Sequence, residues 1–142
     1  MKNTDGKEKL NPGKGNILVM DDEKIVRDMM DMMLSRLGYR GDVVQDGAEA
    51  IEFYQKAKDC GQPYDVVILD LTVRGGMGGR EAIQRLAEID PDVKGILTSG
   101  GPNDPIMNEY KKYGFKSVVV KPFTVDELSE KLTEVMMETD TK

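Results

Sequence analysis

The residues of this chain that are best suited to chemistry each follow an apolar run. The runs are 17–20, 66–69, 96–97 and 118–120, and the residues behind them are, in the same order, Asp21 with Asp22, Asp70, Thr98 with Ser99, and Lys121. In an open α/β sheet, ligands bind outside the carboxyl ends of the parallel strands, where these side chains would meet. Three carboxylates, a hydroxyl and an ammonium group suit a divalent metal ion and a phosphoryl group.

The three carboxylates are the most demanding part of this set. Within about 5 Å of one another they would repel by roughly 3 kcal/mol per pair at an effective dielectric constant near 20, so they need a cation. Oxygen ligands favour Mg²⁺ or Mn²⁺. We expect Asp22 and Asp70 to bind it directly, Asp21 through water, and one backbone carbonyl of the following loop to bind as well. An aspartate can also act as a nucleophile and form an aspartyl-phosphate, which Lys121 and a hydroxyl would stabilise.

Alternating strand-like and helix-like patterns predict the elements that position these residues. Strands are expected at about 16–20, 40–45, 64–70, 93–98 and 116–120. Helices are expected at about 23–37, 47–59, 79–89 and 103–113, and a fifth begins after Thr124, where Glu127 completes a capping box. Five such units predict an α/β protein with a flavodoxin-like, doubly wound (βα)5 parallel sheet in the strand order 2-1-3-4-5. In that order the strand of Asp70 lies next to the strand of the acidic pair.

Length and composition limit the kind of protein. The 142 residues fit one domain, expected at 16–138, with polar tails at 1–15 and 139–142. The net charge of −6 and the pI of about 4.8 argue against direct binding to nucleic acid or to an anionic membrane. No apolar run reaches the length of a membrane span or resembles a signal core, so we expect a cytoplasmic location. The chain has no histidine and a single cysteine, which excludes His metal sites, His-based nucleophile pairs and an internal disulfide.

Four segments carry a resemblance to a known family. They are ILVMDDE at 17–23, VVILDL at 66–71, TSG at 98–100 and VVVKPF at 118–123. Over about 16–138 the chain resembles the receiver domain of bacterial two-component response regulators. The stretches GKGNILVMDDE, LTVRGGMGG and DPIMNEYKKYGF are especially similar to receivers at the C-terminus of hybrid sensor histidine kinases.

The resemblance implies a role for each carboxylate. Asp70 would accept a phosphoryl group from a kinase phosphohistidine in a Mg²⁺-dependent reaction, after which the domain switches conformation. Asp21, Asp22, Asp70 and the backbone carbonyl of Thr72 would hold the ion. Such a domain is a signalling phosphoacceptor that catalyses its own phosphotransfer and dephosphorylation, and is not an enzyme in the usual sense.

The resemblance also implies the residues that respond to phosphorylation and the partner that supplies the phosphoryl group. Lys121 would contact the phosphoryl group, and the Lys121-Pro122 bond is often cis in this family. We assign the responding hydroxyl to Ser99 rather than Thr98, because Gly100 beside it leaves room for the loop to close. The expected partner is a sensor histidine kinase or a histidine phosphotransfer protein, and a homodimer is left open.

Three positions depart from the family pattern. Proline is usual four residues after the acceptor, but Arg74 stands there, and the glycine-rich loop 75–79 is one glycine longer. The aromatic residue usual three positions before the lysine is Val118. Either Thr98 or Ser99 can be matched to the hydroxyl residue of the family. We interpret Arg74 as an exposed loop residue, with contact to the phosphoryl group as the alternative.

Two other functions share parts of this pattern. A phosphatase-type hydrolase also forms an aspartyl-phosphate with Mg²⁺, but it usually has a second Asp two residues after the nucleophile, where this chain has Thr72. A flavodoxin-like electron carrier needs Ser, Thr and Gly in its first loop, where this chain has Asp21, Asp22 and Glu23. Bound flavin would also colour the protein yellow. The sequence therefore favours the receiver domain over both alternatives.

Overall fold

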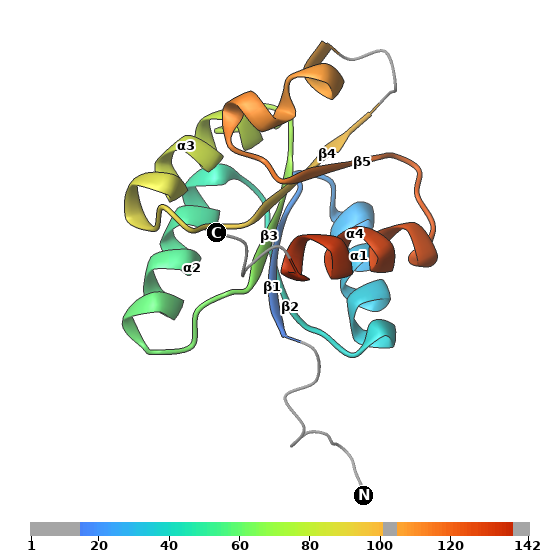
Figure 1. Cartoon of the computed structure of the whole chain (residues 1–142), viewed down its shortest axis with the longest axis horizontal. Helices are drawn as coiled ribbons and strands as arrows, with labels where there is room; N and C mark the ends of the chain where they lie inside the picture. Colours follow the sequence, from blue (N-terminus) through green and yellow to red (C-terminus); the bar gives the residue numbers. More distant parts are fainter. Residues whose placement is uncertain (1–14, 101–104, 138–142) are drawn as a thin grey trace, which may run out of the picture.

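The buried apolar runs form a parallel sheet at the centre of the molecule (Figure 1). The computed structural model describes residues 15–100 and 105–137, so the expected tails lie outside it except for Gly15. The strands are β1 (Asn16–Met20), β2 (Arg40–Val44), β3 (Val66–Asp70), β4 (Gly95–Ser99) and β5 (Ser117–Val120). All neighbouring pairs are parallel and their order is β2-β1-β3-β4-β5, which confirms the predicted topology.

Two helices cover each face of the sheet. The helices are α1 (Lys24–Leu37), α2 (Gly47–Asp59), α3 (Gly79–Ile89) and α4 (Val125–Met137). Figure 1 shows α1 and α4 on one side of the sheet and α2 and α3 on the other. Side chains alternate along the strands, so Ile17 and Val19 pack in the core under α1 and α4, whereas Leu18 and Met20 pack in the core under α2 and α3. In the described part of the chain, no helix is both long and apolar enough to cross a membrane.

The segment between β4 and β5 differs from the prediction of an α-helix at 103–113. Its described part contains two short 3₁₀ helices, η1 (Pro105–Asn108) and η2 (Tyr110–Tyr113), and residues 103–104 lie outside the description. Glu109 between them has φ −129°, which no helix allows. In 3₁₀ geometry residues three apart lie on one side, so Tyr110 and Tyr113 both pack on the core next to α2 and α3. The expectation of one α-helix here is therefore wrong, although the apolar face points inward.

The start of α4 is fixed by the predicted capping box. The backbone N–H of Thr124 donates to Glu127 Oε1 at 2.8 Å, and the N–H of Glu127 donates to Thr124 Oγ1 at 3.1 Å. These bonds satisfy two donors that the first turn would otherwise leave without partners. Because α4 begins four residues after Lys121, the cap also fixes the chain that carries this lysine.

Two glycines let the loop after β3 fold back onto the strand end. A Cβ at Gly78 would lie 2.5 Å from the carbonyl oxygen of Leu71, and one at Gly79 would lie 2.6 Å from that of Asp70. The N–H of Gly79 donates to Leu71 O at 3.2 Å. The first turn of α3 therefore lies directly against the backbone of Asp70, a position that a larger residue cannot take without moving the strand end.

We predict that Gly79→Ala destabilises the protein, although alanine is the better helix former. The added Cβ meets backbone and not a flexible side chain, so the strand end or the helix must shift, at a net cost of about 1–2 kcal/mol. Urea unfolding followed by circular dichroism measures the change. Gly100→Ala is the control, because an added Cβ there has no neighbour within 4 Å. Equal stability of the two variants would contradict the close approach.

Candidate functional site

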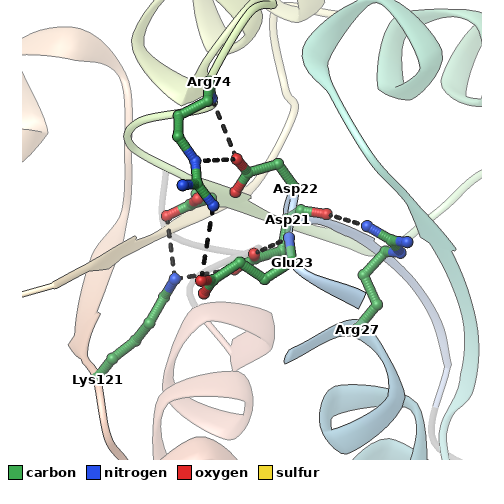
Figure 2. A network of polar contacts seen from close by, with 7 residues as sticks. Asp21, Asp22, Glu23, Arg27, Arg74 and Lys121 are labelled. Atoms are coloured by element: carbon green, nitrogen blue, oxygen red, sulfur yellow. Dashed lines mark hydrogen bonds and ion pairs between the residues drawn. The ribbon is translucent and has the colours of Figure 1, made fainter. Parts of the chain in front are cut away.

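Three carboxylates meet at the carboxyl ends of β1 and β3. Figure 2 labels two of them, Asp21 and Asp22, together with Lys121. One oxygen from each of Asp21, Asp22 and Asp70 lies within 4.8 Å of the others. Asp21 and Asp70 are buried, with 2% and 7% of their surface exposed, and Asp22 is half-buried. Because β1 and β3 are parallel neighbours, their ends reach the same edge of the sheet. This arrangement of oxygen ligands fits a hard divalent cation.

The position of Asp21 is fixed by contacts on all sides. Its backbone N–H donates to Val44 O at 3.1 Å, and its carbonyl accepts a bond from Arg27 Nη1 at 2.9 Å. Its Oδ1 accepts the backbone N–H of Glu23 at 2.9 Å, and its Oδ2 accepts Lys121 Nζ at 2.9 Å. Both carboxylate oxygens of Asp21 therefore already have donors, and its indirect role at a metal ion stays a prediction.

Lys121 follows the edge strand β5 and brings a positive charge to the cluster. Its Nζ lies 2.9 Å from Asp21 Oδ2 and 3.3 Å from Asp70 Oδ1. The lysine follows β5, so its side chain crosses the end of β4 to reach β3. The backbone N–H of Lys121 donates to Ser99 O at 2.8 Å, and the bond to Pro122 is cis, as the family resemblance led us to expect. The structure thus brings together all three carboxylates and the lysine selected from the sequence.

The charges of the cluster are not balanced. Burial, and next the charge of Asp21, raise the pKa of Asp70 to about 6 even though Lys121 opposes the shift. Burial disfavours the ammonium form of Lys121, but the two carboxylates outweigh it and raise the pKa of the lysine. The physical reason is that Lys121 contacts two anions, whereas Asp70 faces one cation and two anions. A further cation would relieve this imbalance.

The two candidate hydroxyls lie on opposite faces of β4. Thr98 pairs in register with Asp70, and alternation places it on the face of Ile96, under α1 and α4. Ser99 pairs with Val120 on the other face and is fully buried. The strand ends at Ser99, one residue later than predicted. Of the buried side-chain oxygens and nitrogens in the described residues, only Thr98 Oγ1 has no hydrogen-bond partner.

The loop after β3 contains the remaining predicted ligand and one residue whose contacts the sequence analysis missed. Thr72 is exposed two residues beyond Asp70, and its carbonyl as a ligand stays a prediction. Arg74 is also exposed, yet its backbone N–H donates to Asp22 Oδ2 at 3.1 Å and its Nε lies 3.5 Å from the same oxygen. The hydrogen bond from the backbone of Arg74 is the main cause that lowers the pKa of Asp22. The only signal in the sequence was that Arg74 replaces the usual proline.

The comparisons with known proteins agree with this geometry. A family model described as the response regulator receiver domain matches residues 17–133. The chain is 32% identical over 120 residues to the chemotaxis protein CheY of Thermotoga maritima, covering 84% of this chain and 95% of that protein. It is 26% identical over 114 residues to the sporulation initiation phosphotransferase F of Bacillus subtilis, covering 80% of this chain and 87% of that protein.

Solved structures show the same similarity. The response regulator protein TrrA of Thermotoga maritima, solved in complex with Mg(2+)-BeF, is 31% identical with a TM-score of 0.71 over 84% of this chain and 97% of that one. A receiver domain protein from Clostridium thermocellum, 22% identical with a TM-score of 0.77 over 87% of this chain and 95% of that one, shares the fold.

We predict that Asp70→Asn stabilises the metal-free protein at about pH 8. The raised pKa means that the folded state disfavours the ionised carboxylate relative to the unfolded state, so ionisation of Asp70 removes stability as the pH rises from about 4 to about 6. Asparagine avoids this loss, and we expect a gain of about 1–3 kcal/mol in urea unfolding with EDTA. At about pH 4 the gain should vanish, because Asp70 is then protonated in the folded state.

Two comparisons show whether this gain comes from the cluster. Excess Mg²⁺ should cancel or reverse it, since the ion supplies the missing charge to wild-type protein. Asp92→Asn, which neutralises an exposed carboxyl in the turn before β4, should leave stability within about 0.5 kcal/mol of wild type. An Asp70→Asn protein that is no more stable than wild type at about pH 8 would mean that Lys121 already balances the charge.

Proposed function

The chain belongs to the response regulator receiver domain family, and on that basis we propose that Asp70 is the residue that accepts the phosphoryl group. A receiver domain is a signalling phosphoacceptor of a two-component system and not an enzyme in the usual sense. The observation that carries the proposal is the position of Asp70 between the acidic pair and Lys121. Lys121 contacts Asp70 Oδ1 at 3.3 Å, and no donor of the described residues contacts Oδ2, which is our choice of nucleophile.

We propose that Mg²⁺ binds directly to Asp22, Asp70 and the backbone carbonyl of Thr72, and to Asp21 through water. Both oxygens of Asp21 already accept hydrogen bonds, which supports its indirect role. The similar protein TrrA was solved in complex with Mg(2+)-BeF, which supports the choice of Mg²⁺ as the ion. Mn²⁺ has similar ligand preferences and is the expected substitute. When bound, the ion would neutralise negative charge on the oxygens of the transferred group.

In the proposed step, Asp70 Oδ2 attacks the phosphorus atom of a phosphohistidine on the partner. The O–P bond forms while the P–N bond breaks, and the imidazole nitrogen leaves with the bonding electron pair and takes up a proton from water. Lys121, already beside Asp70, would then pair with a phosphoryl oxygen. The Ser99 hydroxyl would donate to another phosphoryl oxygen, and its movement would start the conformational change. Hydrolysis of the acyl phosphate by water would reset the domain.

We propose a sensor histidine kinase or a histidine phosphotransfer protein as the donor, because this chain has no histidine of its own to carry the phosphoryl group. The stretches 71–79 and 104–115 favour a hybrid arrangement, in which the kinase lies upstream on the same polypeptide. The coding sequence before this chain tests that arrangement. A cytoplasmic location is supported by the exposed free thiol of Cys60, which is typical of a reducing compartment.

We predict that acetyl phosphate transfers one phosphoryl group to the wild-type protein only when Mg²⁺ is present. Intact-protein mass spectrometry measures the adduct, and Asp70→Asn should abolish it because the nucleophile is lost. Asp92→Asn, with the same change of charge at an exposed turn, should be modified like wild type. An adduct on the Asp70→Asn protein, or one that forms in EDTA, would contradict the proposed acceptor.

We predict that Ser99→Ala separates phosphorylation from the conformational response. Its phosphorylation rate should stay within about threefold of wild type, because a hydroxyl contributes one hydrogen bond. The amide NMR shifts that beryllium fluoride induces beyond the site should be largely lost. Thr98→Val keeps the shape of Thr98 and removes its hydroxyl, and it should respond like wild type. The reverse result, in which Thr98→Val loses the induced shifts and Ser99→Ala keeps them, would assign the function to Thr98.

A further inference from the structure

The guanidinium group of Arg74 occupies one side of the acidic cluster (Figure 2). Its Nε lies 3.5 Å from Asp22 Oδ2, and its Nη2 lies 4.0 Å from Glu23 Oε2. The backbone N–H of Arg74 donates to the same Asp22 oxygen at 3.1 Å. Lys121 reaches the buried Asp21 and Asp70 but has no contact with Asp22. The carboxylate that Lys121 leaves uncompensated is therefore the one that Arg74 covers.

We propose that Arg74 is a tethered counter-ion of Asp22 that competes with the divalent cation and thereby sets the affinity of the metal site. The inference rests on the proposed function, because it needs Asp22 as a metal ligand. Two positive groups that share one carboxylate repel each other, so a bound ion weakens the contact between the guanidinium group and Asp22, and that contact in turn weakens binding of the ion. Arg74 thus lowers the affinity for the metal ion while keeping the metal-free cluster partly neutral.

The loop that carries Arg74 can release it without coming away from the rest of the domain. Its far end is fixed, because Gly47 N–H donates to Met77 O at 2.8 Å and a Cβ at Gly47 would lie 2.7 Å from Met77 Cγ. Gly75, with φ +74°, and Gly76 lie between Arg74 and this fixed Met77. An added Cβ at Gly75 would meet nothing within 4 Å. Arg74 can therefore leave Asp22 by rotation at Gly75 while Met77 stays on the start of α2.

The contact is weak enough to be displaced and strong enough to be measured. The Arg74 side chain is 82% exposed and that of Asp22 is 18% exposed, so the pair lies at the surface and is screened by salt. Removing the guanidinium group should tighten metal binding by about 3- to 5-fold at low ionic strength, the upper part of the range for exposed ion pairs. High salt should reduce this difference. The backbone contact of Arg74 survives any side-chain substitution, so the variants test the guanidinium group alone.

The test is isothermal titration of Mg²⁺ into the full chain at low ionic strength. Arg74→Gln should lower the Kd by about 3- to 5-fold, and Arg74→Lys should fall between it and wild type. Arg85→Gln is the matched control, because Arg85 lies on α3, pairs with no acidic residue but Glu81 (at 3.3 Å) in the described part of the chain, and carries the same charge. The control should stay within about twofold of wild type. Equal shifts for Arg74→Gln and Arg85→Gln, or no shift for either, would overturn the proposal.

A second measurement uses the unaltered protein. The side-chain Nε–H resonance of Arg74 should move as Mg²⁺ saturates the site, and the amide of Gly75 should move with it, whereas the Nε–H of Arg85 should not. An unmoved Arg74 resonance in a protein that binds the ion would overturn the proposal and leave the metal site intact. If wild type binds no Mg²⁺, or if Asp22→Asn binds it as tightly as wild type, the ligand assignment under the proposed function fails and this inference falls with it.

Discussion

The excess of negative charge at the ends of β1 and β3 is the constraint on which the site depends. Asp21 and Asp70 are buried together, and one ammonium group, that of Lys121, serves both. A lysine between two carboxylates is strongly held, but Asp70 is left in an environment that raises its pKa to about 6. The half-buried ammonium group of Lys121 offsets part of the negative charge of the cluster, and the charge that remains suits a second cation.

The strands hold the acidic and hydroxyl side chains of the site in place, and the segments between strands supply its positive charges. All residues of β3 and β4 are buried, so the strand ends that carry Asp70 and the two hydroxyls are held by packing on both faces. The cations arrive from segments outside the strands. Lys121 follows β5 and crosses the end of β4, and Arg74 lies in the loop after β3. The two cations that we propose to exchange partners therefore both lie outside the strands, in connecting segments, which move more readily than strands.

The described part of the segment between β4 and β5 is irregular. Instead of an α-helix, the described residues form η1 and η2, and Tyr113 of η2 lies under the guanidinium group of Arg80 on α3, at 4.7 Å from the ring centroid. Val118 of β5 packs in the same core without a ring that could change position. Val118 therefore offers no alternative contact for a conformational change to exchange.

The sequence by itself determined the strands, their order and the four charged residues of the site. Apolar runs buried on both faces are recognisable locally, and parallel connection forces their carboxyl ends to one edge, so Asp21, Asp22, Asp70 and Lys121 could be brought together from their positions after those runs. The capping box of Thr124 and Glu127 was equally predictable, because both partners lie within one turn.

Only the tertiary structure decided which groups offset which charges. Arg74 and Asp22 are 52 residues apart in sequence, and nothing in the local pattern of either residue encodes the approach of the β3–α3 loop to the start of α1. The same holds for residues 105–113 of the expected helix, which form 3₁₀ turns with Tyr110 and Tyr113 packed against the core. Local periodicity reports which side of an element is buried, whereas the choice of partner depends on where distant loops meet, and that is fixed by packing of the whole domain.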